Sequence, residues 1–190
     1  MYRIAVHGVA LGALALALAA CSDTVVGGGF PSGSYNRDTL TYLAVSGPVP
    51  VRTVGNPFSG TQEALTQAVA DRFSLPGWFT PATFAPAAPD APKKGYHVTF
   101  VFNPAVQPDV RDVCGDVPDQ IPLQIESGRL RVVAAYCYRD EAINRVSARA
   151  PLAEPGSAAF GALLDAISFS LFPDPGPTFN PFPRRRKIEP

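Results

Sequence analysis

The chain has 190 residues, with 16 basic and 16 acidic side chains, so its formal net charge is zero. A neutral chain has no overall field that would recruit nucleic acid, and this length suits one folded domain. Proline is the unusual component, because the chain has 21 prolines and all of them follow residue 30. Proline has no backbone N–H and breaks helix and sheet interiors, so we expect long irregular loops.

The first twenty residues have the three zones of an export signal. Arg3 is followed by the apolar run VALGALALALAA, residues 9–20, and small residues lead into Cys21. This order is typical of a secretory signal peptide, and the run is shorter than the roughly 20 residues that cross a bilayer. Two alternatives remain open: a buried N-terminal helix, and secretion with cleavage after Ala20 but without a lipid.

The end of this run, Leu18-Ala19-Ala20-Cys21, resembles the lipobox of bacterial lipoproteins. The resemblance implies a lipid on the Cys21 thiol, cleavage before Cys21 and an acylated new N-terminus. Several acyl chains hold a protein stably to a membrane. Ser22 follows the cysteine, where Asp would resemble an inner-membrane retention signal. The expected location is therefore the cell envelope, with the lipid bilayer as partner and the outer membrane, facing the periplasm, favoured.

Cleavage would leave 170 residues and remove Arg3, so 15 basic side chains would face 16 acidic ones, a net charge near −1. We divide this mature chain into a flexible Gly/Ser tether over 21–38, a single domain over 39–172 and a proline-rich basic tail over 173–190. The tether is predicted from the Gly27-Gly28-Gly29 triplet, since such sequences form flexible coils.

Cys114 and Cys137 are the cysteines left after Cys21. An even pair in an oxidising compartment indicates a structural disulfide, here closing a loop of about 24 residues. A redox or metal pair is the alternative, but no C-x-x-C is present and His97 is the one histidine outside the signal. We therefore expect no metal and no cofactor.

The elements that we expect, in chain order, are these. A strand is predicted over 39–46, a loop over 48–57, a helix from Ser59 to before Pro76, and a strand over 96–102. A short strand over 123–126 precedes a strand over 130–138. Residues 143–150 are either its hairpin partner or a short helix, and a last helix runs from Ser157 to before Pro173. The class expected is α+β, an antiparallel sheet of four or five strands with two helices packed on one face and long proline-rich loops.

The last helix is predicted from an apolar stripe at helical spacing. Its members are Phe160, Leu163, Leu164, Ile167 and Leu171.

An aromatic ligand pocket is one interpretation of the proline-punctuated segment 77–95. The candidate ligand-binding residues are Trp78, Phe79, Phe84, Tyr96 and Phe100. The other interpretation is a loop that packs down on the domain as a lid. A small apolar or sugar ligand would suit such a pocket.

Catalytic patterns are weak, and we assign no catalytic residue. His97 lies in mid-strand without a nucleophile in its sequence context, and a lone strand histidine is more often a surface or packed residue. The acids 109, 112, 116 and 119 suggest calcium ligands, but their spacing is not that of an EF-hand. Glu126 and Asp140 are candidates for paired carboxylates, although no spacing singles them out. A hydrolase is the third interpretation.

The tail carries four consecutive basic residues, Arg184, Arg185, Arg186 and Lys187. Basic residues near anionic lipid are worth about 1 kcal/mol each, so lipid phosphates or an acidic protein face are candidate targets. The alternative is a solubilising terminus. The sequence favours a non-enzymatic envelope lipoprotein with a binding or assembly role, with a partner protein at the tail and no nucleic acid. A small-ligand binding module is the second hypothesis.

Overall fold

The computed structural model describes residues 23–29, 31–88, 95–115, 120–124 and 126–174. Within these residues the chain is α+β, and six strands form one sheet in the order β1-β6-β5-β4-β2-β3. The strands are β1 (Val25–Gly28), β2 (Val49–Val54), β3 (Phe84–Pro86), β4 (Tyr96–Phe102), β5 (Arg129–Tyr138) and β6 (Glu141–Pro151). The sheet is mixed, because β2 runs parallel to both β3 and β4 while the other pairs are antiparallel. The expectation of a purely antiparallel sheet of four or five strands was wrong in this detail.

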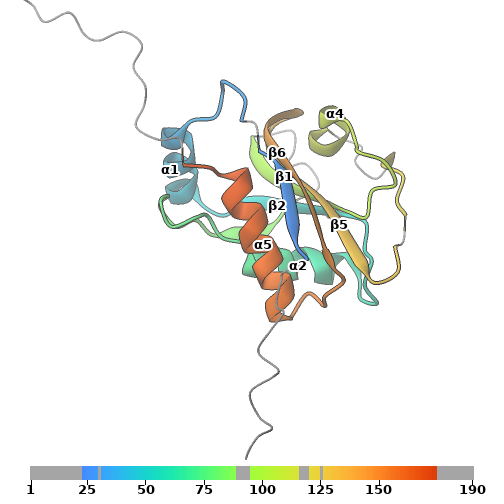
Figure 1. Cartoon of the computed structure of the whole chain (residues 1–190). Helices are drawn as coiled ribbons and strands as arrows, with labels where there is room; N and C mark the ends of the chain where they lie inside the picture. The colour runs from blue at the N-terminus through green and yellow to red at the C-terminus, as the bar shows by residue number, and fades with distance from the viewer. Residues whose placement is uncertain (1–22, 30, 89–94, 116–119, 125, 175–190) are drawn as a thin grey trace, which may run out of the picture.

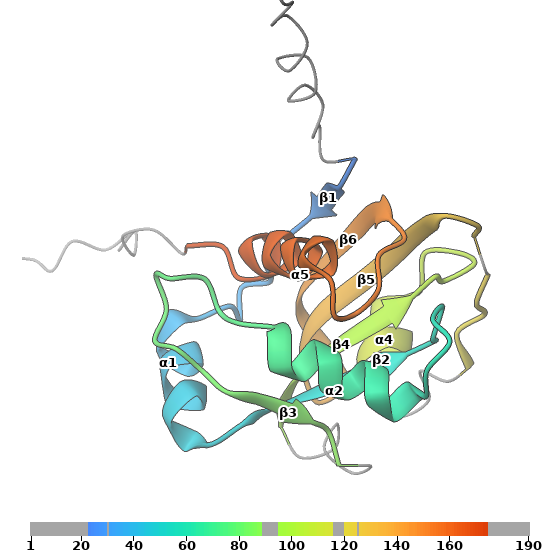
Figure 2. The same ribbon diagram turned by 90° about the horizontal axis from the view of Figure 1, so that it is seen from below.

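Four helices lie against this sheet in the described part of the chain: α1 (Arg37–Ser46), α2 (Gln62–Arg72), α4 (Val110–Cys114) and α5 (Ala158–Leu171). The two longest, α2 and α5, cover one face, which we call the inner face, and short α4 contacts β4, β5 and β6 on the outer face (Figures 1 and 2). The expectation of two helices on one face is met by α2 and α5, and α1 and α4 were missed.

The main core lies between the inner face and the two long helices. Alternate residues of β4 and β5 point into it, as the pleat of a strand requires. From β4 come Val98, Phe100 and Phe102, and from β5 come Leu130, Val132, Ala134 and Tyr136. The stripe predicted for the last helix is buried here throughout, and Ser157 caps that helix as predicted, accepting from the Phe160 backbone N–H at 3.2 Å.

A second, smaller core lies under α4 on the outer face. Val113 and Cys114 of α4 pack there against Val101, Val133 and Cys137. Cys114 and Cys137 form a disulfide with an S–S distance of 2.01 Å, which confirms the predicted bridge. The bridge ties α4 covalently to β5.

The segment predicted as a strand over 39–46 is helix α1. Asn36 is its N-cap, and its side chain accepts from the Asp38 backbone N–H at 2.7 Å. Leu40, three residues before Leu43, is buried in the main core. The capping asparagine, followed by an acid in the first turn, was the local signal for a helix, and it outweighs the β-branched residues of the segment.

The segment predicted as a loop over 48–57 contains β2. Val49 and Val51 are buried in the main core with one residue between them, which is the period of a strand. Pro50 lies within this strand. It is tolerated because the pairing of β2 with β4 begins only at Val51, so its missing N–H breaks no bond to β4.

The predicted tether over 21–38 contains edge strand β1. Val25 to Gly28 pair antiparallel with Arg149 to Val146 of β6, and the Gly29 backbone N–H donates to the Arg145 carbonyl at 3.0 Å. Backbone pairing along β6 therefore orders a glycine-rich sequence that composition alone describes as coil.

Two other predictions agree with the structure, and two more agree only in part. The strand over 96–102 is β4, and the hairpin is β5 and β6, so residues 143–150 form a strand rather than a helix. The helix expected from Ser59 begins later, since Thr61 is the N-cap of α2. The short strand over 123–126 is reduced to a single bridge between Leu123 and Pro104.

Candidate binding face

Four arginines gather on the outer face of the β5–β6 hairpin. Residues that alternate along a strand share a face, so Arg129 and Arg131 of β5 lie on the same side as Arg145 and Arg149 of β6. Arg131 is directly opposite Arg149 in the register. We call the surface lined by these four residues the arginine face.

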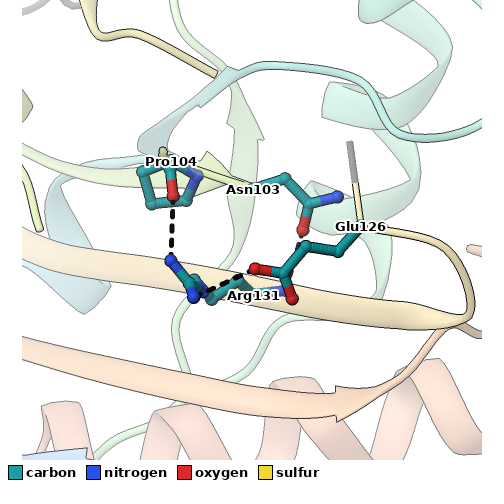
Figure 3. A network of polar contacts seen from close by, with 4 residues as sticks. All are labelled: Asn103, Pro104, Glu126 and Arg131. Carbon is teal, nitrogen blue, oxygen red and sulfur yellow. Dashed lines mark hydrogen bonds and ion pairs between the residues drawn. The ribbon is translucent and has the colours of Figure 1, made fainter. Parts of the chain in front are cut away.

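Arg131 is held in place by three polar contacts (Figure 3). Its Nη2 lies 3.0 Å from Glu126 Oε1, and its Nη1 donates to the Pro104 carbonyl oxygen at 3.4 Å. Its backbone N–H donates to Asn103 Oδ1 at 2.8 Å. About 30% of each side chain in the Arg131–Glu126 pair stays exposed, 29% and 30% respectively. The guanidinium group is therefore oriented but still reachable from solvent.

Arg145 is also oriented by backbone, because its Nη1 donates to the Pro108 carbonyl oxygen at 2.8 Å. Beside it, the Ser147 hydroxyl donates to Gln107 Oε1 at 3.2 Å. Arg129 and Arg149 are exposed and form no ion pair within the described residues. Two like charges directly opposite on neighbouring strands repel each other, and the Glu126 carboxylate beside Arg131 offsets part of the repulsion between Arg131 and Arg149.

Three cavities follow one another along β6 on this face. Their volumes are about 310, 400 and 420 Å³. The cavity of about 310 Å³ lies between the other two. It shares Gly27 and Ser147 with the cavity of about 400 Å³, and Val25 and Arg149 with the cavity of about 420 Å³. Gly27 contributes to the open space, because a Cβ added there would have nothing within 4 Å.

The charge of these cavities is one-sided. All four arginines line them, and Asp23 is the one carboxylate among the lining residues. Glu126 offsets the charge of Arg131, so among the described residues the unpaired positive charge on this sheet face comes from Arg129, Arg145 and Arg149. If residues 143–150 are taken as a strand, alternation alone places Arg145, Ser147 and Arg149 on one face. That pattern does not show that β5 adds two more arginines beside them.

A cavity of about 390 Å³ with the opposite charge lies at the turn of the same hairpin; we call it the hairpin cavity. Three carboxylates line it, from Asp109, Asp140 and Glu141, together with Arg111. Tyr96 and Tyr138 also line it, with ring centroids 4.7 Å apart. Asp140, one of the acids considered for catalysis, thus lies here, whereas Glu126 is at the other end of the hairpin with Arg131.

The five residues predicted to bind a ligand all belong to the main core or pack against it. Phe79 and Phe100 are buried, so neither side chain is open to a ligand in this conformation. Phe84 packs on Phe73, and Trp78 Nε1–H donates to the Phe172 carbonyl oxygen at 3.1 Å. Burial of apolar surface in the main core explains the positions of these aromatic rings. Of the five candidate residues, Tyr96 is the one that lines the hairpin cavity.

His97 lies fully buried on the outer side of β4, directly opposite Cys137 in the register. Its Nδ1 is 3.4 Å from the Gly95 carbonyl oxygen, and its Nε2 has no hydrogen-bond partner within the described residues. Burial lowers the pKa of His97 to about 4, and the nearby Arg52 guanidinium adds to this. The imidazole is therefore neutral at ordinary pH and packed between sheet and helix.

Several predicted residues fall outside the described part of the chain: Cys21, Arg184, Arg185, Arg186, Lys187, Asp116 and Asp119. Asp109 and Asp112, the other two acids of that loop, form the capping box of α4. In the described ranges no group of three or more His, Cys, Asp or Glu side chains is placed to hold a metal ion. None of the helices described is both long enough and apolar enough to cross a membrane.

No family model matches the sequence, and no curated protein matches it. Among solved structures, the chain is similar to a PelC dodecamer from Paraburkholderia phytofirmans. The TM-score is 0.41 at 10% sequence identity, over 78% of this chain and 97% of that chain. At this distance the likeness carries no functional information.

Proposed function

We propose that the chain is an envelope lipoprotein, anchored through Cys21, that binds an acidic partner on its arginine face and does no chemistry on it. The anchor is proposed from the lipobox-like sequence. The binding role is supported by one observation in particular: four arginines and a single carboxylate line the cavities along β6.

Arginine is well suited to this role. Its planar guanidinium group binds carboxylates and phosphates through two parallel hydrogen bonds and stays charged at any physiological pH. Arg131 and Arg145 each have backbone carbonyls that fix their direction, so little side-chain freedom is lost on binding. We place the acidic partner against Arg131 and Arg145. These two residues line neighbouring cavities, and Gln107 and Ser147 line both of those cavities.

A partner can be identified by crosslinking in cells, purification from gently solubilised envelopes and mass spectrometry. We expect the variant with Arg131→Gln and Arg145→Gln to lose most of the crosslinked partner, at least ten-fold, because two oriented charges are removed. Arg139→Gln is the matched control, since Arg139 is an exposed arginine in the hairpin turn, away from the arginine face. A partner retained at the wild-type level by the double variant would refute the role of this face.

The basic tail can be tested in the same experiment. Truncation after Asp174 is preferable to removing Pro173, because the Pro173 carbonyl oxygen accepts from the Tyr35 hydroxyl at 2.8 Å. A partner that depends on residues 184–187 is lost on truncation, and a partner of the arginine face is retained.

A small-ligand binding module is the second candidate. It is favoured by the hairpin cavity, where Tyr96 and Tyr138 stand beside three carboxylates. Aromatic rings with a few convergent polar groups are typical of ligand sites. This candidate predicts that Tyr138→Ala removes ligand binding while the crosslinked partner is kept.

A further inference from the structure

The position of β1 determines how close the domain lies to its anchor. Asp23 is two residues after Cys21, and Val25 is already paired with Arg149 of β6. Two residues of fully extended chain span at most about 7 Å. Asp23 therefore lies within about 7 Å of the Cys21 Cα atom, whatever path the chain takes between them. This inference rests on the proposed lipid anchor.

The chain after Asp23 offers little slack, because β1 is fixed to the domain. Its four residues pair with β6, and beyond it the Ser32 backbone N–H donates to the Ile143 carbonyl oxygen at 2.7 Å. Val26 packs against the main core. A lipid on Cys21 would therefore hold one particular end of the sheet at the membrane, instead of a domain on a long tether.

That end of the sheet is visible in Figure 1 as the end where β1 begins, beside the connection from β6 to α5. The described chain ends at the opposite end of α5, near α1 (Figures 1 and 2). The cavity at the membrane end, about 420 Å³ in volume, is lined by Asp23, Gly128, Arg129, Arg149 and Pro151, among others. The two arginines are exposed.

Apolar side chains accompany these charges. Val25 is 66% exposed and Leu152 is 40% exposed, and the Leu152 backbone N–H donates to the Gly128 carbonyl oxygen at 3.0 Å, so Leu152 lies at this end. Exposed valine and leucine beside arginine suit the boundary between lipid headgroups and acyl chains. The carboxylates of Asp23 and Glu154 lie close by in the chain and offset part of the positive charge of the two arginines. This surface therefore orients the domain, while the acyl chains supply most of the affinity for the membrane.

We propose that the Asp23 end of the sheet rests on the membrane that holds the anchor, with Arg129 and Arg149 bound to the phosphate groups of anionic phospholipids. Arg145 lies farther along the hairpin from this end, and Arg131 is level with Arg149 but on β5, one strand farther from β1. Both remain open to the acidic partner. The membrane thereby presents the rest of the arginine face, with Arg131 and Arg145, sideways to the envelope space.

The test measures the reaction of arginines with phenylglyoxal by mass spectrometry. The lipidated full mature chain is reconstituted in vesicles of phosphatidylcholine alone, or of phosphatidylcholine with phosphatidylglycerol. On the anionic vesicles we expect Arg129 and Arg149 to react roughly five-fold more slowly than on the neutral ones, the factor expected for one basic residue at an anionic surface. Arg139 serves as the internal control, since it is about 30 Å from Arg129 along β5 at 3.3 Å per residue, and its rate should not change.

Two further arms complete the test. High salt should remove the protection, because it shortens the Debye length to about 3 Å at 1 M. Arg149→Gln should reduce the protection of Arg129, and Arg139→Gln should not. Equal rates for Arg129 and Arg149 on the two kinds of vesicle, or protection of Arg139 in their place, would overturn the proposed orientation.

The mass of the N-terminal peptide, taken from the same preparation, separates this inference from the proposed function. A lipid on Cys21 without protection of Arg129 and Arg149 leaves the anchor intact and refutes the orientation. An N-terminal peptide without lipid refutes the anchor, and the inference that depends on it fails as well.

Discussion

His97 has the most perturbed environment of any base in the described part of the chain. It is fully buried beside the Cys114–Cys137 disulfide, and Arg52 stands close enough to disfavour a second positive charge. A histidine of this kind stabilises the fold while it is neutral, because protonation would place an imidazolium ion in a buried site beside the Arg52 guanidinium.

The free energy of unfolding should therefore depend on pH through His97. Its pKa is about 4 in the folded chain against an ordinary value of 6.5, so the unfolded chain takes up the proton first as pH falls. The contribution is complete above pH 6.5 and is lost progressively down to about pH 4, by roughly 3 kcal/mol in total. Urea unfolding of the wild type and of His97→Leu measures this, because the variant lacks the titrating group. A difference between the two proteins that stays constant from pH 7 to pH 4 would contradict the assignment.

At the scale of elements, α4 shows how a five-residue helix is kept in place. Asp109 and Asp112 cap its N-terminus, and Arg52 Nη2 donates to the carbonyl oxygens of Val113 and Gly115, both at 3.0 Å, at its C-terminus. So short a helix is not stable by itself. The disulfide from Cys114 to Cys137 adds a covalent tie to the sheet, and α4 in turn covers His97 and the smaller core.

Replacing both cysteines by alanine should lower the free energy of unfolding by about 3 kcal/mol, the chain-entropy value for a loop of about 24 residues. Hydrogen exchange should increase first in α4 and the adjacent part of β4, and amides in the middle of α5 should keep their protection. Chemical denaturation of the oxidised wild type and the double variant measures the total. Unchanged unfolding midpoints, or faster exchange that begins in α5, would show that the bridge has no such role.

Elements with a strong internal pattern could be predicted from the sequence, and elements formed by pairing could not. The stripe of α5 and the alternation of β4 are properties of one segment, so both were predicted with nearly correct bounds. β1 and β2 exist because a neighbouring strand pairs with them, and neither Gly27-Gly28-Gly29 nor Val49-Pro50-Val51 has a strand pattern strong enough to show this. The arginine face was half predicted for the same reason, since Arg129 and Arg131 join it only through the β5–β6 register.

For the whole molecule, the two sheet faces have different roles. The inner face, under α2 and α5, holds the large aromatic core, and the five rings considered for a ligand pocket are used in or against it. The outer face is only partly covered by α4, and it carries the polar cavities along the hairpin. Charge is segregated along the hairpin, with arginines on the outer face of β5 and β6 and three carboxylates around the hairpin turn. A neutral chain can therefore present two surfaces of opposite sign.

The proposed membrane attachment would give these surfaces their direction, and it depends on Cys21 being the lipidated first residue of the mature protein. The most direct measurement is the mass of the N-terminal peptide of the protein purified from envelopes, with Cys21→Ala as the matched control. We expect a peptide that begins at Cys21 and carries a lipid on the thiol and an acyl chain on the amine, and an uncleaved, unlipidated precursor for the control. A peptide that begins at Cys21 with a free thiol, or one that retains residues 1–20 in the wild type, would contradict it.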